Sequence, residues 1–161
     1  HYKAGKYQAA VDQFSTLIGI DPSRANAYDW RGSIYRKLGQ YETGILDFDQ
    51  AIRLDPSNAT FYYWRGSTYF KLGQYEMAIL DFDQAIRLDP TNAAYYDWRG
   101  GTYFKLEQYE TAIQDYDQAI RLDPSNATFY GWRASAHRKL GNMEEARSDE
   151  AKACSLDKKH C

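Results

Sequence analysis

The chain has 161 residues and a formal net charge of −2, with 26% charged residues. A near-neutral chain has no overall attraction to nucleic acid or to an anionic membrane surface, which disfavours both as partners. No apolar run reaches the roughly 18 residues that a membrane-spanning helix needs.

The N-terminal stretch, "HYKAGKYQAA", contains neither an initiator Met nor a signal-peptide pattern. It also begins in the middle of a repeat unit, as the spacing below indicates. We therefore expect the natural N-terminus to lie upstream, so that this stretch does not indicate a compartment.

A period of 34 residues organises the chain. All four prolines follow it, at Pro22, Pro56, Pro90 and Pro124, and so do all four tryptophans, at Trp30, Trp64, Trp98 and Trp132. Residues 59–92 and 93–126 are identical at 25 of 34 positions. Units of this length stack on one another, because one unit alone cannot bury its apolar face. The period therefore argues against a globular domain with a single core.

Each unit has the pattern of two helices. In residues 59–92, Asn58 is a good N-cap for a first helix and Gly73 is a good C-terminal stop. A second helix is predicted from about residue 74 to residue 88, before Pro90 ends the unit. Its apolar stripe consists of Ala78, Ile79, Phe82, Ala85 and Ile86. The sequence therefore predicts a helical hairpin.

These units resemble the tetratricopeptide repeat (TPR) family, counted from Ala25, Ala59, Ala93 and Ala127. The matching landmarks are Gly32, Gly66, Gly100 and Ala134 at position 8; Tyr35, Tyr69 and Tyr103 at 11; Gly44, Ala78, Ala112 and Ala146 at 20; Phe48, Phe82 and Tyr116 at 24; and Ala51, Ala85, Ala119 and Ala153 at 27. The resemblance covers the whole chain. It implies an all-α fold, a right-handed α-solenoid of stacked antiparallel helical hairpins.

The units are expected in the following order along the chain. Residues 1–24 are the second helix of a partial unit, with Ala10, Phe14 and Pro22 at landmark positions. Full units follow at 25–58, 59–92 and 93–126. Residues 127–161 form a divergent unit, in which Glu150 replaces the aromatic residue of position 24. We expect this last unit to act as a C-terminal cap, which solenoids need for solubility.

The resemblance implies a concave groove lined by the first helices. Helical steps of about 100° place Trp64, Ser67 and Lys71 on the side facing away from the hairpin core. The expected ligand-binding residues are Trp30, Trp64, Trp98, Trp132, Tyr63, Phe70, Phe104, Arg36, Lys37, Lys71, Lys105, Arg138, Lys139, Asp29 and Asp97. The charged groove positions comprise six basic and two acidic residues, a net charge of +4, whereas the second helices are acidic.

Each of these features also has a structural interpretation. The Trp row can pack between adjacent first helices instead of binding a ligand, and the Lys of position 13 can stabilise the C-terminus of its helix. The Arg of position 7, at Arg31, Arg65, Arg99 and Arg133, is expected to form an ion pair with an Asp of the second helix or of the "LDP" turn.

Searches for catalytic or metal-binding patterns find none. His1, His137 and His160 are scattered, and no phosphate loop, HExxH motif or Ser-His-Asp set is present. The aspartates of the repeated "DFDQ" point in different directions on a helix, so a metal site is not expected. The sequence predicts neither an enzyme nor a cofactor.

Cys154 and Cys161 lie seven residues apart, at the C-terminal end. On one unbroken helix they are about 10.5 Å apart, too far for a disulfide. If the helix ends near Leu156 and the chain turns back, a bridge becomes feasible and implies an oxidising, extracytoplasmic compartment. A buried Cys154 thiol beside a flexible end is the alternative.

The sequence therefore favours a protein-interaction module whose groove binds an acidic partner segment with apolar or aromatic groups. A chaperone C-terminal tail is not expected, because Trp stands at position 6, where the family's carboxylate clamp needs Asn. The alternatives are a self-associating scaffold and the recognition arm of a larger multidomain protein. Single-stranded nucleic acid is disfavoured by the small charge excess.

Overall fold

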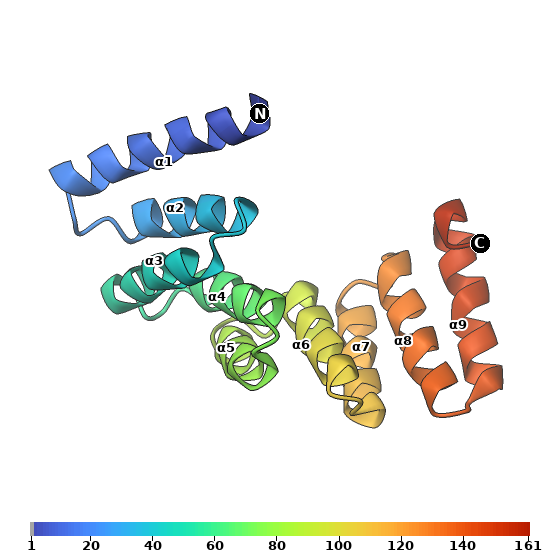
Figure 1. Cartoon of the computed structure of the whole chain (residues 1–161). Coiled ribbons are helices and arrows are strands. Elements are labelled where there is room, and N and C mark those ends of the chain that lie inside the picture. Colours follow the sequence, from blue (N-terminus) through green and yellow to red (C-terminus); the bar gives the residue numbers. More distant parts are fainter. Residues whose placement is uncertain (1) are drawn as a thin grey trace. The chain divides into compact units, whose positions relative to one another are not determined.

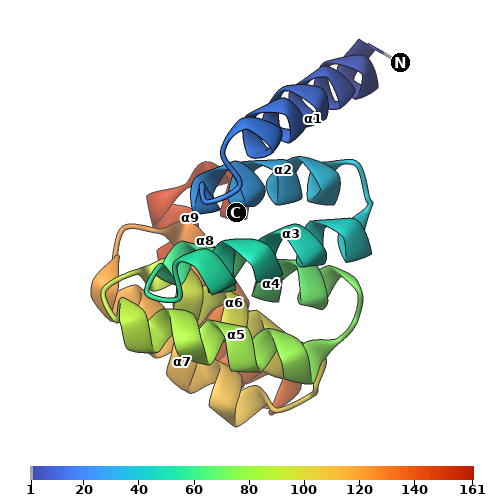
Figure 2. The same ribbon diagram turned by 90° about the vertical axis from the view of Figure 1, so that its left-hand side faces the viewer.

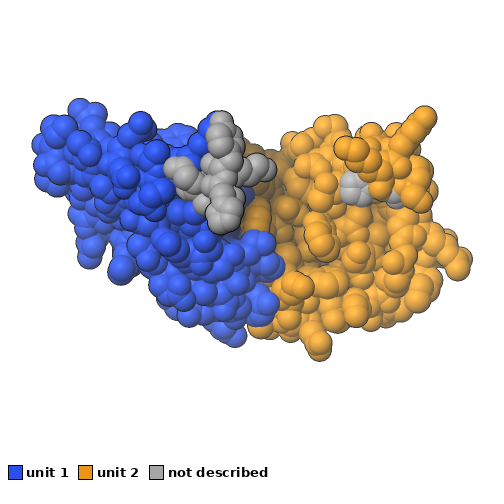
Figure 3. All heavy atoms as spheres, turned by 45° about the horizontal axis from the view of Figure 1, so that its top comes forward, with its two compact units in different colours: residues 1–88 blue, residues 89–161 orange. Residues whose placement is uncertain are grey.

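The computed structural model describes the backbone of residues 2–161 and the side chains of residues 6–159 and 161. Within these residues all regular structure is helical, and no strand occurs. The all-α prediction is therefore confirmed. The chain divides into two compact units, unit 1 (residues 1–88) and unit 2 (residues 89–161), coloured separately in Figure 3.

Unit 1 contains one second-type helix followed by two hairpins (Figure 1). The helices are α1 (Tyr2–Ile20), α2 (Ala25–Lys37), α3 (Tyr41–Leu54), α4 (Ala59–Lys71) and α5 (Tyr75–Leu88). Helix α3 contacts both α2 and α4, and α1 packs on α2, as Figure 2 shows from the side. Because α2 follows α1 directly, no first-type helix precedes α2 in the described chain.

Unit 2 contains two further hairpins. Its helices are α6 (Ala93–Lys105), α7 (Tyr109–Leu122), α8 (Ala127–Lys139) and α9 (Met143–Leu156), followed by the 3₁₀ turn η1 (Lys158–His160). Helix α8 contacts both α7 and α9, and η1 packs on α8 and α9. The predicted second helices begin within a residue of the observed starts.

Local sequence signals account for the helix ends. Asn58, Asn92 and Asn126 each accept a hydrogen bond from the backbone N–H two residues on, as N-caps do. The hairpin turns of unit 1 use Gly39 and Gly73, with φ of +77° and +75°. The α6–α7 turn adopts the same left-handed conformation with Glu107, whose φ is 60°. A glycine is favoured there because it has no Cβ to clash.

Close approach of the two helices in each hairpin requires a small residue at position 8. A Cβ placed on Gly66 would lie 3.0 Å from the Cβ of Asp81 and 3.0 Å from the Phe82 ring. Phe48, Phe82 and Tyr116 fill the adjacent space and are fully buried. In the last hairpin Ala134 takes position 8, and there the facing residue is Glu150 rather than an aromatic residue.

The arginine of position 7 joins each hairpin to the next, and its predicted ion pair is confirmed. Arg65 donates two hydrogen bonds to Asp81, at 2.9 and 2.7 Å, and a third to Asp49 of the preceding hairpin, at 2.6 Å. Arg133 is held in the same way by Asp149 and Asp117. Arg31 bonds Asp47 but reaches Ser15 of α1 instead of an aspartate. Such bidentate pairs keep a buried carboxylate satisfied and orient both helices.

Candidate functional site

The tryptophans differ in how far their neighbours cover them. Trp30 on α2 is 59% exposed, and Trp132 on α8 is 47% exposed. Trp64 is half-buried: the guanidinium of Arg36, on the preceding first helix, lies 4.7 Å from its ring centroid. Trp64 therefore packs in the way that the structural interpretation expects, whereas Trp30 and Trp132 present large uncovered apolar surfaces.

A pocket of about 370 Å³ lies beside Trp30 in unit 1. Phe14 and Leu17 of α1 provide its apolar wall, and Asp55 and Asn58 of the α3–α4 turn provide polar groups. Apolar walls combined with a few polar groups are typical of ligand pockets. The pocket and the exposed indole therefore form one continuous candidate surface.

The other predicted aromatic residues are partly packed within their own hairpins. The Tyr63 ring lies 4.7 Å from that of Trp64, and Phe70 meets the edge of Tyr75 at 5.5 Å. Phe104 meets Tyr109 in the same way at 5.2 Å. All three are half-buried, so each has one covered and one accessible side.

Most of the predicted basic residues lie at the ends of first helices. Lys37, Lys71, Lys105 and Lys139 are each the last residue of their helix and are exposed. This place also stabilises the helix dipole. Arg36 is half-buried against Trp64, and burial lowers its pKa. Arg138 forms an ion pair with Glu150, so the last hairpin offers Lys139 as its more available cation.

Asp29 and Asp97 are less accessible than their predicted place in the groove suggests. Asp29 is buried and Asp97 is half-buried, and the Oδ1 atom of each is enclosed without a hydrogen-bond donor. Burial raises the pKa of both carboxyls to about 6. The buried aspartates of position 23, by contrast, are held by arginines. The two position-5 aspartates thus remain available to a donor.

The assignment of Ser67 to the accessible side is wrong. Its side chain is fully buried, and its hydroxyl donates to the carbonyl of Trp64 at 2.9 Å. Sequence reasoning also missed the burial of Phe61 and Thr68, since they lie off the face inferred from one hairpin. The signal was present for Phe61, because Tyr95 and Phe129 repeat an aromatic residue at its position and are also buried.

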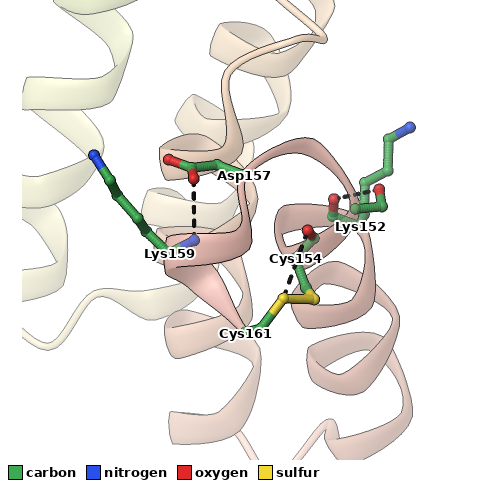
Figure 4. The surroundings of a disulfide bond; sticks show 6 residues. Lys152, Cys154, Asp157, Lys159 and Cys161 are labelled. Atoms are coloured by element: carbon green, nitrogen blue, oxygen red, sulfur yellow. Dashed lines mark hydrogen bonds between the residues drawn. A yellow bond between two sulfur atoms is a disulfide. The ribbon is translucent and has the colours of Figure 1, made fainter.

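At the C-terminal end, α9 stops at Leu156 and the chain turns back through η1. The structure joins Cys154 and Cys161 in a disulfide, with their Cα atoms 4.6 Å apart (Figure 4). Asp157 starts the turn by accepting a hydrogen bond from the Lys159 N–H at 3.0 Å. The bridge therefore holds the turn against the last helix.

The structure gives no separate indication of catalysis. Among residues 2–161, no group of three His, Cys, Asp or Glu side chains is arranged to hold a metal ion. His137 lies on α8 with an enclosed Nδ1 atom that has no partner. His1 lies outside the described residues, as does the side chain of His160. No helix in the described chain is both long and apolar enough to cross a membrane.

Paired helices and an accessible first-helix surface define a helical-repeat protein of the kind that acts as a scaffold for protein interactions. Family models bear this out. One described as "TPR repeat" matches residues 32–73 and 100–141, and others described as "Tetratricopeptide repeat" match 1–47, 59–92, 82–114 and 127–160. The chain belongs to the tetratricopeptide repeat family.

Solved structures show the same fold at low sequence identity. A crystal structure of MamA is 24% identical over 98% of this chain and 92% of its own, with a TM-score of 0.90. MamA from Desulfovibrio magneticus RS-1 is 20% identical over 98% and 89%, with a TM-score of 0.89. YrrB, described as a TPR protein with an unusual peptide-binding site, is 20% identical over 99% and 82%, with a TM-score of 0.81. No curated protein matches the chain.

Proposed function

We propose that this chain is a scaffold whose first-helix surface binds an extended segment of a partner protein. The observation that carries the proposal is the exposure of Trp30 and Trp132, at 59% and 47%. Large aromatic side chains at the centre of an interface commonly supply most of its binding energy. The pocket beside Trp30 is suited to an apolar side chain of the partner. The proposal assigns no catalytic step to the chain.

The partner segment is proposed to combine apolar or aromatic side chains with acidic ones. Lys37, Lys71 and Lys105 are exposed at the ends of α2, α4 and α6, where they attract carboxylates. A chaperone C-terminal tail fits poorly, since tryptophan occupies position 6 of every full unit. The peptide-binding site named for YrrB supports a peptide ligand by analogy of fold alone.

A peptide array tests this function. Wild type is compared with Trp30→Ala and Trp132→Ala, because both side chains are exposed and their loss leaves the core intact. Met143→Ala is the control, since Met143 is 50% exposed on α9 outside the proposed surface. We expect both tryptophan variants to lose binding by about tenfold or more, with unchanged helicity by circular dichroism. Equal binding by wild type and both variants would overturn the proposal.

Self-association is a second candidate function, favoured by a different surface. Leu46 on α3 and Leu80 on α5 are 67% and 61% exposed on the second helices, and Met77 is 45% exposed. Exposed apolar patches of this kind mark interaction sites. Light scattering over a range of concentrations tests it. A dimer lost in Leu46→Gln/Leu80→Gln supports the candidate, and a strict monomer contradicts it.

The Cys154–Cys161 disulfide supports an extracytoplasmic location, because such bonds persist in oxidising compartments. Mass spectrometry of the protein isolated with its thiols blocked distinguishes the bridged form from two free cysteines. Two blocked thiols would contradict this assignment and leave the proposed binding function unaffected.

A further inference from the structure

The hairpin of residues 93–126 differs from the others at two facing positions. Position 24 is Tyr116, where Phe48 and Phe82 stand in the two preceding hairpins. Position 9 is Gly101, where the other full units have Ser33, Ser67 and Ser135. The first change adds a phenol oxygen beneath α6, and the second removes a side chain above it.

The Tyr116 hydroxyl is an unpaired polar group in a buried place. The residue is 0% exposed, and its oxygen has no hydrogen-bond partner. It faces Gly101: a Cβ placed on that glycine would meet within 4 Å only this oxygen, 3.8 Å away. Leaving a buried hydroxyl without a partner is unfavourable by about 1–3 kcal/mol. The substitution of Phe by Tyr therefore does not serve packing alone.

Asp97 supplies a second unpaired acceptor at the same place. It lies one helical turn before Gly101 on α6, and its Oδ1 atom is enclosed without a donor. Burial raises the pKa of the Tyr116 phenol, and the negative charge of Asp97 raises it further, which shows that the two groups are close enough to interact. The buried Asp115 of the same hairpin is instead held by Arg99 at 2.6 Å. Two oxygen acceptors thus converge where the chain provides no donor.

We infer that Asp97, Tyr116 and Gly101 form a subsite for a positively charged side chain, of the lysine ammonium class, from the bound partner segment. An ammonium group carries three N–H donors and can satisfy the carboxylate and the phenol oxygen together. A charge-assisted bond in a partly desolvated place is stronger than a neutral one. Gly101 leaves the space that the side chain needs. This inference rests on the proposed peptide-binding function and adds a basic residue to the acidic and apolar segment proposed there.

The test uses two arrays of the same 12-residue peptides, which differ at the central residue. One array has lysine there and the other has norleucine, which keeps the apolar stem without the ammonium group. We expect wild type to prefer lysine over norleucine by about tenfold, and Asp97→Asn to lose that preference. Tyr116→Phe is expected to weaken it several-fold. Phe occupies this position in two other hairpins, so this variant retains the fold.

Glu110→Gln is the matched control. It removes one negative charge from the same hairpin at an exposed position in the first turn of α7, and it should retain the lysine preference. Wild type that binds both arrays equally overturns the subsite and leaves the proposed function intact. A lysine preference that persists in Asp97→Asn also overturns the subsite. Wild type that binds neither array overturns the subsite and the proposed function together.

Discussion

Unit 1 exposes Leu46 and Leu80 on its second helices, whereas at the same repeat position unit 2 has Gln114 and Ser148. Beneath this difference both units use the same small residues and the same arginine–aspartate pairs to hold each hairpin together. The comparison shows that the packing positions are constrained in both units, while the outer face varies. Functional differences between the units should therefore arise from residues outside the repeat landmarks.

The largest expected effect comes from breaking the ion pair that both units share. Arg65→Met leaves Asp81 buried without its partner, and we expect the free energy of unfolding to fall by about 3 kcal/mol. Arg133→Met should behave similarly in unit 2, since Asp149 is equally buried. Urea unfolding followed by circular dichroism measures both. Arg53→Met, at an exposed residue bonded only to Gln50, is the control, and an equal loss there would contradict the proposed cause.

The second effect tests the close helix contact at position 8. Gly66→Ala places a Cβ 3.0 Å from both Asp81 and Phe82, and we expect a loss of about 2 kcal/mol through overpacking. In unit 2, Ala134 occupies this position opposite Glu150 and is buried. Ala134→Gly should therefore lower stability only by the helix propensity difference, about 1 kcal/mol. Thermal unfolding of both variants decides, and a harmless Gly66→Ala would show that the contact can relax.

A third effect depends on pH and involves one aspartate in each unit. Burial raises the pKa of Asp29 and of Asp97 to about 6, above the unfolded value near 4. The protonated carboxyls therefore contribute stability that is fully present below about pH 4 and is lost as the pH rises through 6. We expect each to account for a decrease of about 2 kcal/mol over this interval. Unfolding of Asp29→Asn/Asp97→Asn should lack this decrease, and an unchanged pH profile would contradict the assignment.

The smallest effect concerns the turns. Unit 1 uses glycine at both left-handed turn positions, whereas the α6–α7 turn of unit 2 uses Glu107 with φ of 60°. Glu107→Gly should raise the free energy of unfolding by up to about 1 kcal/mol, because the left-handed conformation is unfavourable for a residue with a Cβ. A decrease on substitution, measured in urea, would show that the Glu107 side chain contributes a stabilising contact.

Much of the local structure was predictable from the sequence. The 34-residue period, the asparagine N-caps and the glycine stops predicted the helices and their ends, because these signals act within a few residues of one another. The arginine–aspartate pairs were also predictable, since the helical angle of position 7 points toward the second helix. The expectation that each residue of the first-helix face would be accessible was less accurate. It failed for Ser67 and overestimated the exposure of Asp29.

The sequence by itself determined the repeat, the hairpins and the family, because periodic apolar residues and caps specify helices locally. Only the tertiary structure decided which equivalent residues are covered. Trp64 and Trp30 hold the same repeat position, yet Arg36 of the preceding first helix covers one, and no such helix precedes the other in the described chain. Likewise, Asp81 has an arginine and Asp97 has none. Burial and pairing depend on neighbouring helices, and the period of a repeat does not record what those neighbours leave open.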